Sequence, residues 1–166
     1  MEVLRTLYEC IVLNCDAHMQ MRGVTYKPAG SPVEVGLLNF LLSNGVNVQE
    51  KLIERESDAV ALKLWIPFSS ERKLMTVAYT LRDDPSTTRL VVKGAPEHVV
   101  AMCSTQLDSF NNPSSFAGDQ QQGAEYLSQV VEEDIIKPRT QDDTGLKALT
   151  IAFRDFPTDQ FDAMRE

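Results

Sequence analysis

The chain has 166 residues, of which 43% are hydrophobic and 24% charged, a composition typical of a folded globular domain. Its net charge of −8 argues against general nucleic-acid binding, which requires a basic face. No run approaches the roughly 18 apolar residues of a membrane span, and the N-terminal segment lacks the cleavage site of a secretory signal. Three cysteines without a CxxC pair predict reduced thiols, and two distant histidines predict no metal site.

The N-terminal part of the chain predicts two helices separated by a loop. Apolar residues at helical spacing predict the first helix over residues 4–15, and residues 22–30 are expected to form the loop. Ser31 and Glu34 then frame a capping box with proline at the first helical position. In it the Ser31 hydroxyl accepts the third helical N–H, and the Glu34 carboxylate reaches back to the Ser31 N–H. This second helix is expected to end near residues 44–45, an Asn-Gly pair.

Strand formers dominate from residue 58 onward. They predict strands over residues 59–66, 74–81, 89–92 and 149–153, with a turn at 82–88. The other segments between and after them are predicted to be a short helix opening at Pro96, an exposed loop at 104–123, a helix at 124–136, a linker at 137–144 and a helix beginning at residue 157. Since helices and strands alternate irregularly around a hairpin, the sequence predicts an α+β fold, with a mainly antiparallel β-sheet flanked by helices.

Three segments combine residue types that could hold a ligand: FSSERK at 68–73, KGAPE at 93–97 and GLKAL at 145–149. An aromatic face can stack on a flat heterocycle, a lysine can hold a polar edge or a phosphate, and glycine allows close approach of the backbone. Such a set suits a nucleotide, and it contains no group placed to activate water. Each residue also has a structural interpretation, as a core aromatic, a solvated lysine or a helix cap.

Two alternative hypotheses remain open at this point. The string DDTG superficially resembles a phosphorylatable aspartate motif and suggests a phosphohydrolase of the haloacid-dehalogenase type, with Asp142 or Asp143 as nucleophile. It lacks the lysine of that motif and precedes a predicted strand. The acidic charge and the polar segment 104–123 suggest a protein-interaction domain with a vestigial nucleotide site. The GxxxxGK[ST], GxGxxG, HExxH and GxSxG motifs are absent from the sequence.

The motifs FSSERKLM and KGAPE, with a [S/T]PxE-type helix start before them and GLKALTIAFRD after them, resemble the nucleotide-binding domain of P-type ATPases. The resemblance covers roughly residues 2–156, and its details are most similar to calcium pumps of the plasma-membrane type. It implies that residues 1–166 form a single nucleotide-binding domain of a larger membrane pump. The phosphorylated DKTGT motif, the TGE loop and the membrane helices of that family are absent from the chain.

The resemblance implies ATP as the ligand and assigns four residues to the adenine. Phe68 would stack on the ring, Lys93 would line the deep end of the pocket, and Gly94 would let the nucleotide approach. Glu34 would contact the adenine amino edge, a role that competes with its helix cap.

Two lysines would lie nearer the phosphates. The resemblance places Lys73 near the adenine or the phosphates, and Lys147 where many relatives carry an arginine. Lysine keeps the positive charge of arginine but lacks its bidentate guanidinium, so we expect weaker binding of the phosphates. No catalytic residue and no metal ligand is expected in the chain itself, and magnesium is expected with ATP in the parent pump.

The resemblance also implies how the domain works in its parent protein. The parent would be a calcium-transporting enzyme that couples ATP hydrolysis to ion transport, whereas this domain would bind ATP and present the γ-phosphate to a phosphorylation domain. Its expected partners are ATP and the phosphorylation and actuator domains, with no nucleic acid and no direct membrane contact. We expect a monomeric, cytosolic domain of an integral membrane protein, of the plasma membrane rather than the endoplasmic reticulum.

Overall fold

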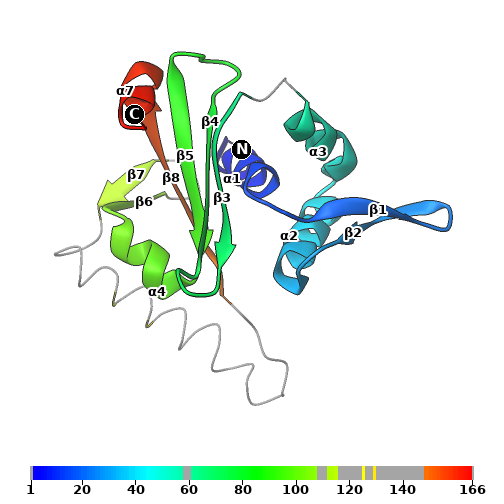
Figure 1. Cartoon of the computed structure of the whole chain (residues 1–166). Helices are drawn as coiled ribbons and strands as arrows, with labels where there is room; N and C mark the ends of the chain where they lie inside the picture. Colours follow the sequence, from blue (N-terminus) through cyan, green and yellow to red (C-terminus); the bar gives the residue numbers. More distant parts are fainter. Residues whose placement is uncertain are drawn as a thin grey trace. The chain divides into compact units, whose positions relative to one another are not determined.

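The computed structural model describes residues 2–57, 61–107, 112–115, 125, 129 and 148–165. The chain divides into two compact units. Unit 1 comprises Met1–Val3, Phe68–Met75 and Val92–Ala152, and unit 2 comprises Leu4–Pro67, Thr76–Val91 and Phe153–Glu166. The elements are those of an α+β fold with mainly antiparallel sheets flanked by helices, as the sequence predicts (Figure 1).

Both N-terminal helices are confirmed. Helix α1 spans Glu2–Leu13 and helix α2 spans Pro32–Ser43. One half of the predicted capping box of α2 is confirmed, because the Ser31 hydroxyl accepts the N–H of Glu34 at 3.3 Å and proline occupies the first turn. The other half is wrong: the Glu34 carboxylate accepts the Ser31 hydroxyl at 3.3 Å and the Asp16 N–H at 3.0 Å, not the Ser31 N–H. The helix ends at Asn44, and the following Gly45 has a φ of +76°, a left-handed conformation that glycine adopts without steric cost.

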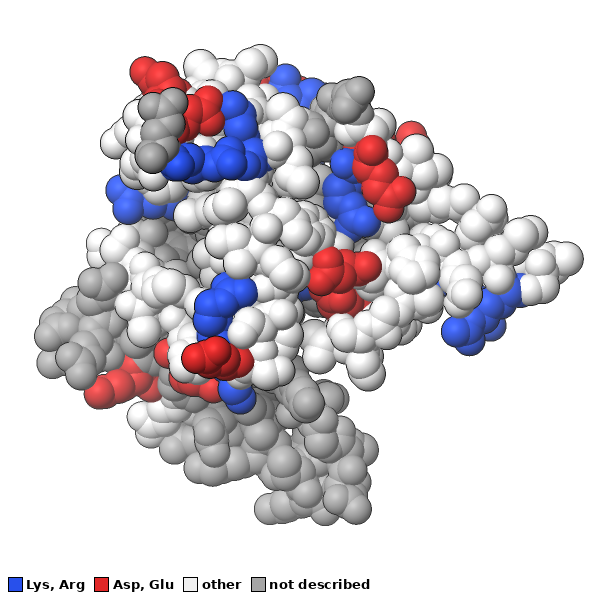
Figure 2. Space-filling view, in the orientation of Figure 1, with Lys and Arg blue, Asp and Glu red and all other residues white. Residues whose placement is uncertain are grey.

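The loop predicted at residues 22–30 is wrong, because most of this segment is a β-hairpin. Strands β1 (His18–Arg22) and β2 (Thr25–Ala29) pair antiparallel, with Met21 opposite Tyr26. The two-residue connection begins with Gly23 at φ +65°, and glycine at this position suits a tight hairpin turn. The strands are short and mostly exposed, so their apolar alternation is weak. Figure 2 shows basic side chains near the end of this hairpin.

Helix α3 spans Val48–Glu56 and is absent from the sequence prediction. It begins like α2, because the Asn47 side chain accepts the N–H of Glu50 at 3.3 Å and donates to the Glu50 carboxylate at 2.9 Å. This Asn-x-x-Glu spacing is the signal that could have revealed the helix. Near its other end, the Arg55 guanidinium donates to the carbonyls of Val12 and Cys15 and so satisfies acceptors at the end of α1.

The four predicted strands are confirmed and form one sheet, although their ends differ from the predicted ones. The order in the sheet is β3–β4–β5–β8 (Figure 1). Their bounds are Leu62–Ser69 for β3, Leu74–Thr80 for β4, Thr87–Gly94 for β5 and Thr150–Pro157 for β8. Met75, Val77 and Tyr79 of β4 are buried at alternate positions, as predicted, and Ala78 between them is buried as well. Strand β4 therefore has buried side chains on both faces.

The chain after β5 confirms one predicted helix and corrects one predicted loop. Helix α4 spans Pro96–Val99 and continues into the 3₁₀ helix η1, Val100–Met102. Within the segment predicted as an exposed loop, strands β6 (Thr105–Leu107) and β7 (Pro113–Ser115) pair antiparallel. Three-residue polar strands leave no period-2 pattern to detect, and their side chains are exposed, as predicted for the loop.

The C-terminal helix α7, Thr158–Ala163, begins just after residue 157, as predicted. The predicted helix at 124–136 and linker at 137–144 lie outside the described residues, apart from residues 125 and 129, which are helical. Within the described part of the chain, no helix is both long and apolar enough to cross a bilayer.

Candidate functional site

The FSSERK segment forms the end of β3 and the turn that leads into β4. The N–H of Lys73 donates to the Ser69 carbonyl at 2.7 Å, and the N–H of Arg72 donates to the Ser69 hydroxyl at 3.4 Å. Lys73 has a φ of +58°, and among the described residues it is the one non-glycine residue with positive φ. This conformation costs an L residue about 1–2 kcal/mol, so it persists only where neighbouring contacts hold it.

The first residues of KGAPE lie against this turn. The N–H of Ala95 donates to the carbonyl of Lys73 at 3.2 Å. A Cβ atom on Gly94 would lie 2.3 Å from the same carbonyl oxygen and 2.6 Å from Cδ2 of Leu74. Glycine at this position is therefore explained by packing within the chain. Ser69 and Ala95 hold Lys73 through backbone atoms, so no side-chain pattern in the sequence predicts these two contacts.

Three of the predicted residues in unit 1 differ sharply in exposure. Phe68, near the end of β3, is 55% exposed, whereas large aromatic side chains are highly buried on average. Lys73 is exposed and forms no ion pair with any described residue. Lys93, by contrast, is only 4% exposed. The structure brings Lys73 into contact with Gly94, while the contacts of these residues with adenine or phosphate stay predictions.

Glu34 lies in unit 2 and is 8% exposed. Its Oε1 accepts the N–H of Asp16 at 3.0 Å, and its Oε2 accepts the hydroxyl of Ser31 at 3.3 Å. The carboxylate thus ties the first turn of α2 to the segment that follows α1. Its contact with the adenine amino edge stays a prediction. Lys147, Asp142 and Asp143 lie outside the described residues.

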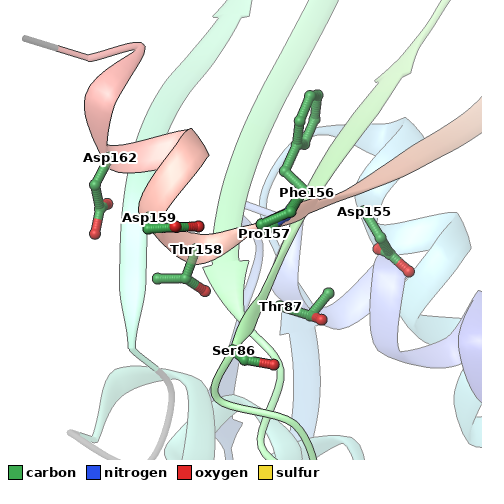
Figure 3. Close-up of a pocket in the computed structure, with 8 residues that line it drawn as sticks. All are labelled: Ser86, Thr87, Asp155, Phe156, Pro157, Thr158, Asp159 and Asp162. Carbon is green, nitrogen blue, oxygen red and sulfur yellow. The ribbon is translucent and has the colours of Figure 1, made fainter.

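A depression of about 760 Å³ occurs in unit 2 (Figure 3). Its lining comes from the turn before β5 and the first residue of that strand, from the end of β8 and from helix α7: Ser86, Thr87, Asp155, Phe156, Pro157, Thr158, Asp159 and Asp162. Asp155 accepts two hydrogen bonds from Arg89, at 2.7 and 2.8 Å, and Asp162 pairs with Lys63 at 2.8 Å. Since cations of the chain already neutralise these two carboxylates, we assign the depression no ligand.

Two of the described cysteines, Cys10 and Cys103, are not activated for nucleophilic chemistry. Burial raises the pKa of the Cys10 thiol to about 12 and also raises the pKa of the Cys103 thiol. Neither thiol is therefore ionised to a useful extent at neutral pH. Within the same ranges, no group of three or more His, Cys, Asp or Glu residues is arranged to hold a metal ion.

The chain is an α+β domain in which the turn after FSSERK meets the start of KGAPE. The chain belongs to the family described as P-type ATPase, cytoplasmic domain N, whose sequence profile matches residues 3–166. It is also similar to the calcium-transporting ATPase lmo0841 of Listeria monocytogenes serovar 1/2a, with 33% identity over 103 residues. The aligned part is 60% of this chain and 10% of that protein, so the chain spans about a tenth of this curated relative.

Proposed function

We propose that this domain binds ATP within a calcium-transporting P-type ATPase and presents the γ-phosphate to the phosphorylation domain of that pump. The observation that carries the proposal is the hydrogen bond from the Ala95 N–H to the Lys73 carbonyl, 3.2 Å long. It joins two segments, FSSERK and KGAPE, whose residue types suit an adenine and its phosphates. Membership of the cytoplasmic domain N family supports the same function.

Two exposed side chains offer partners of suitable chemistry for the adenine and the phosphates of ATP. The ring of Phe68 is available for stacking on adenine, an interaction that contributes about 1–3 kcal/mol per base. The ammonium group of Lys73, which pairs with no described residue, supplies a positive charge for the phosphates in a chain of net charge −8. With few further partners for the triphosphate among the described residues, we expect a Kd of about 0.1–1 mM, which corresponds to roughly 4–5.5 kcal/mol.

Magnesium would bind together with ATP in the parent pump, and we assign it no ligand in the domain. Hydrolysis is assigned to the parent pump as well, because the proposed site combines an aromatic ring, cations and glycine but no activated nucleophile or general base. The domain alone is therefore expected to bind ATP without turning it over.

The test is a titration of the ¹⁵N-labelled chain with ATP, AMP and GTP, followed by two-dimensional amide NMR. We expect shifts near Phe68, Lys73 and Gly94 that are smaller with GTP. Phe68→Ala should weaken ATP binding about tenfold, from the loss of stacking. Phe40→Ala is the matched control, because Phe40 is a similarly exposed phenylalanine on helix α2. A flat titration at millimolar ATP would refute the proposal.

Calcium as the transported ion rests on the resemblance and on the name of the Listeria relative. Ion selectivity belongs to the membrane part of a pump, so its test is transport by the parent protein in sealed vesicles. ATP-driven uptake of ⁴⁵Ca²⁺ would support the assignment. Uptake of another cation with no calcium uptake would contradict it and leave the ATP-binding proposal standing.

A protein-interaction domain with a vestigial nucleotide site is the second candidate function. It is favoured by the β1–β2 hairpin, where Val24 is 95% exposed and Met21 and Tyr26 are exposed as a cross-strand pair. Exposed apolar side chains of this kind are common in binding surfaces. The hairpin also carries Arg22 and Lys27, which would favour an acidic partner. A partner that binds equally with and without ATP, together with the flat titration described above, would favour this function.

A further inference from the structure

Gly94 is enclosed by the turn that carries Lys73, and this enclosure suggests a role other than the predicted one. We propose that Gly94 and Ala95 are positioning residues for Lys73: their backbone holds the Lys73 carbonyl and thereby fixes the direction in which the lysine side chain leaves the chain toward a nucleotide phosphate. The inference rests on the proposed ATP binding. It differs from the predicted role of Gly94, in which the glycine itself allows the nucleotide to approach.

The left-handed conformation of Lys73 needs contacts that hold it. Its N–H is bonded to the Ser69 carbonyl at 2.7 Å, and its own carbonyl is bonded to the Ala95 N–H at 3.2 Å. An L residue without such contacts relaxes to negative φ, because its Cβ crowds the backbone in the left-handed region. The two hydrogen bonds fix the peptide groups on both sides of Lys73 and so determine its φ of +58°.

The missing Cβ of Gly94 makes the second of these bonds possible. A Cβ at this position would lie 2.3 Å from the Lys73 carbonyl oxygen, a backbone atom that cannot swing aside. Gly94→Ala therefore forces the carbonyl of Lys73 away and loosens its hydrogen bond to Ala95. The side chain of Lys73 moves with its backbone, although no atom of Gly94 needs to touch the ligand.

The experiment is a double-mutant cycle on ATP affinity. The Kd for ATP is measured by NMR titration for the wild type, Gly94→Ala, Lys73→Ala and the double variant. We expect each single variant to bind ATP about five- to tenfold more weakly, and the double variant to bind no more weakly than Lys73→Ala alone. Gly36→Ala is the matched control, because an added Cβ on Gly36 meets no atom within 4 Å.

Stability measurements on the same variants separate positioning from a purely structural effect. The backbone carbonyl of residue 73 is present whether that residue is lysine or alanine, so Gly94→Ala should lower the urea midpoint equally in the two cases. The effect of Gly94→Ala on ATP affinity, by contrast, should vanish when residue 73 is alanine. If Gly94→Ala does not fold, Ala95→Pro replaces it in the cycle. Ala95 has φ −63° and ψ 135°, which suit proline, and the substitution removes the N–H that Lys73 requires.

The outcomes distinguish this inference from the function on which it rests. A wild-type chain that does not bind ATP overturns both. A wild-type chain that binds ATP, with Lys73→Ala equal to it, overturns the inference alone. So does an equal loss of affinity from Gly94→Ala in both backgrounds, because that result means that position 94 acts on the ligand without Lys73.

Discussion

Replacement of Glu34 by alanine tests whether its carboxylate stabilises the fold by linking helix α2 to the segment that follows α1. The carboxylate accepts the Asp16 N–H at 3.0 Å and the Ser31 hydroxyl at 3.3 Å, and the residue is 8% exposed. Alanine removes both acceptors and leaves a partly buried amide without its partner. We therefore expect the variant to be less stable and the segment between α1 and β1 to lose its connection to α2.

The expected magnitude follows from the two bonds. A hydrogen bond to a charged group contributes about 1.5–3 kcal/mol, and the bond to Asp16 is of this kind. The bond to Ser31 is longer and adds less, so we expect a total loss of about 2–3 kcal/mol. Glu50 is the matched control, since it occupies the same position in α3 and accepts from Asn47 at 2.9 Å, but is exposed. Glu50→Ala should change stability by no more than about 0.5 kcal/mol.

Two measurements check this prediction. Urea unfolding followed by circular dichroism gives the change in the free energy of unfolding. Amide hydrogen exchange reports directly on the hydrogen bond from the Asp16 N–H to Glu34. A loss of about 2 kcal/mol corresponds to roughly 30-fold faster exchange of the Asp16 N–H. If Glu34→Ala unfolds within about 0.5 kcal/mol of the wild type and Asp16 exchanges at the wild-type rate, the structural reasoning about Glu34 is wrong.

Two further predictions concern charges in unit 2. Arg89 donates two hydrogen bonds to Asp155, and its side chain is 13% exposed against 38% for Asp155. Asp155→Ala should lower the free energy of unfolding, measured in urea, by about 2 kcal/mol, which is less than the ~3–5 kcal/mol lost when one partner of a fully buried ion pair is removed. The double variant Arg89→Leu/Asp155→Leu should lose less stability than Asp155→Ala, because it leaves no unpaired charge. A larger loss in the double variant would contradict this prediction. Burial raises the pKa of Glu9 above its ordinary value of 4.5. The charged carboxylate therefore destabilises the fold at a pH above the raised pKa, and this effect is absent at a pH below 4.5, where the residue is protonated in both the folded and the unfolded state. Glu9→Gln should therefore be more stable than the wild type at about pH 7, and the gain should disappear near pH 4; a gain independent of pH would refute the assignment.

The parts of the fold that could be predicted from sequence are those with strong local signals. The capping box at Ser31 and the glycine at position 45 mark the two ends of α2, and the alternation in residues 74–81 marks β4. The β1–β2 hairpin was missed because its strands are mostly exposed, so burial leaves no period-2 pattern in them. Helix α3 was missed although Asn47 and Glu50 form a cap, because the apolar pattern behind that cap is weak.

The candidate site was predicted as a set of residue types, but the contact that joins its two segments was not. The sequence shows an aromatic residue, lysines and a glycine in FSSERK and KGAPE, and this is enough to propose a nucleotide. It contains no sign of the bond between the Ala95 N–H and the Lys73 carbonyl, because backbone hydrogen bonds of this kind leave no side-chain pattern. It also gives no sign that Lys73 has positive φ, since lysine is not a residue that usually marks the left-handed region.

This contact changes how loss-of-binding variants in the site should be interpreted. Position 94 requires glycine because the Lys73 carbonyl occupies the space that a Cβ would need. Lys73 itself is held in its left-handed conformation by hydrogen bonds to Ser69 and Ala95. The turn and the start of KGAPE therefore act as one physical unit, in which a change at one residue moves the others. A weaker ATP affinity after substitution of Gly94 does not by itself indicate contact with the nucleotide. Only the coupling between Gly94 and Lys73 distinguishes a residue that touches the ligand from one that positions the residue that does.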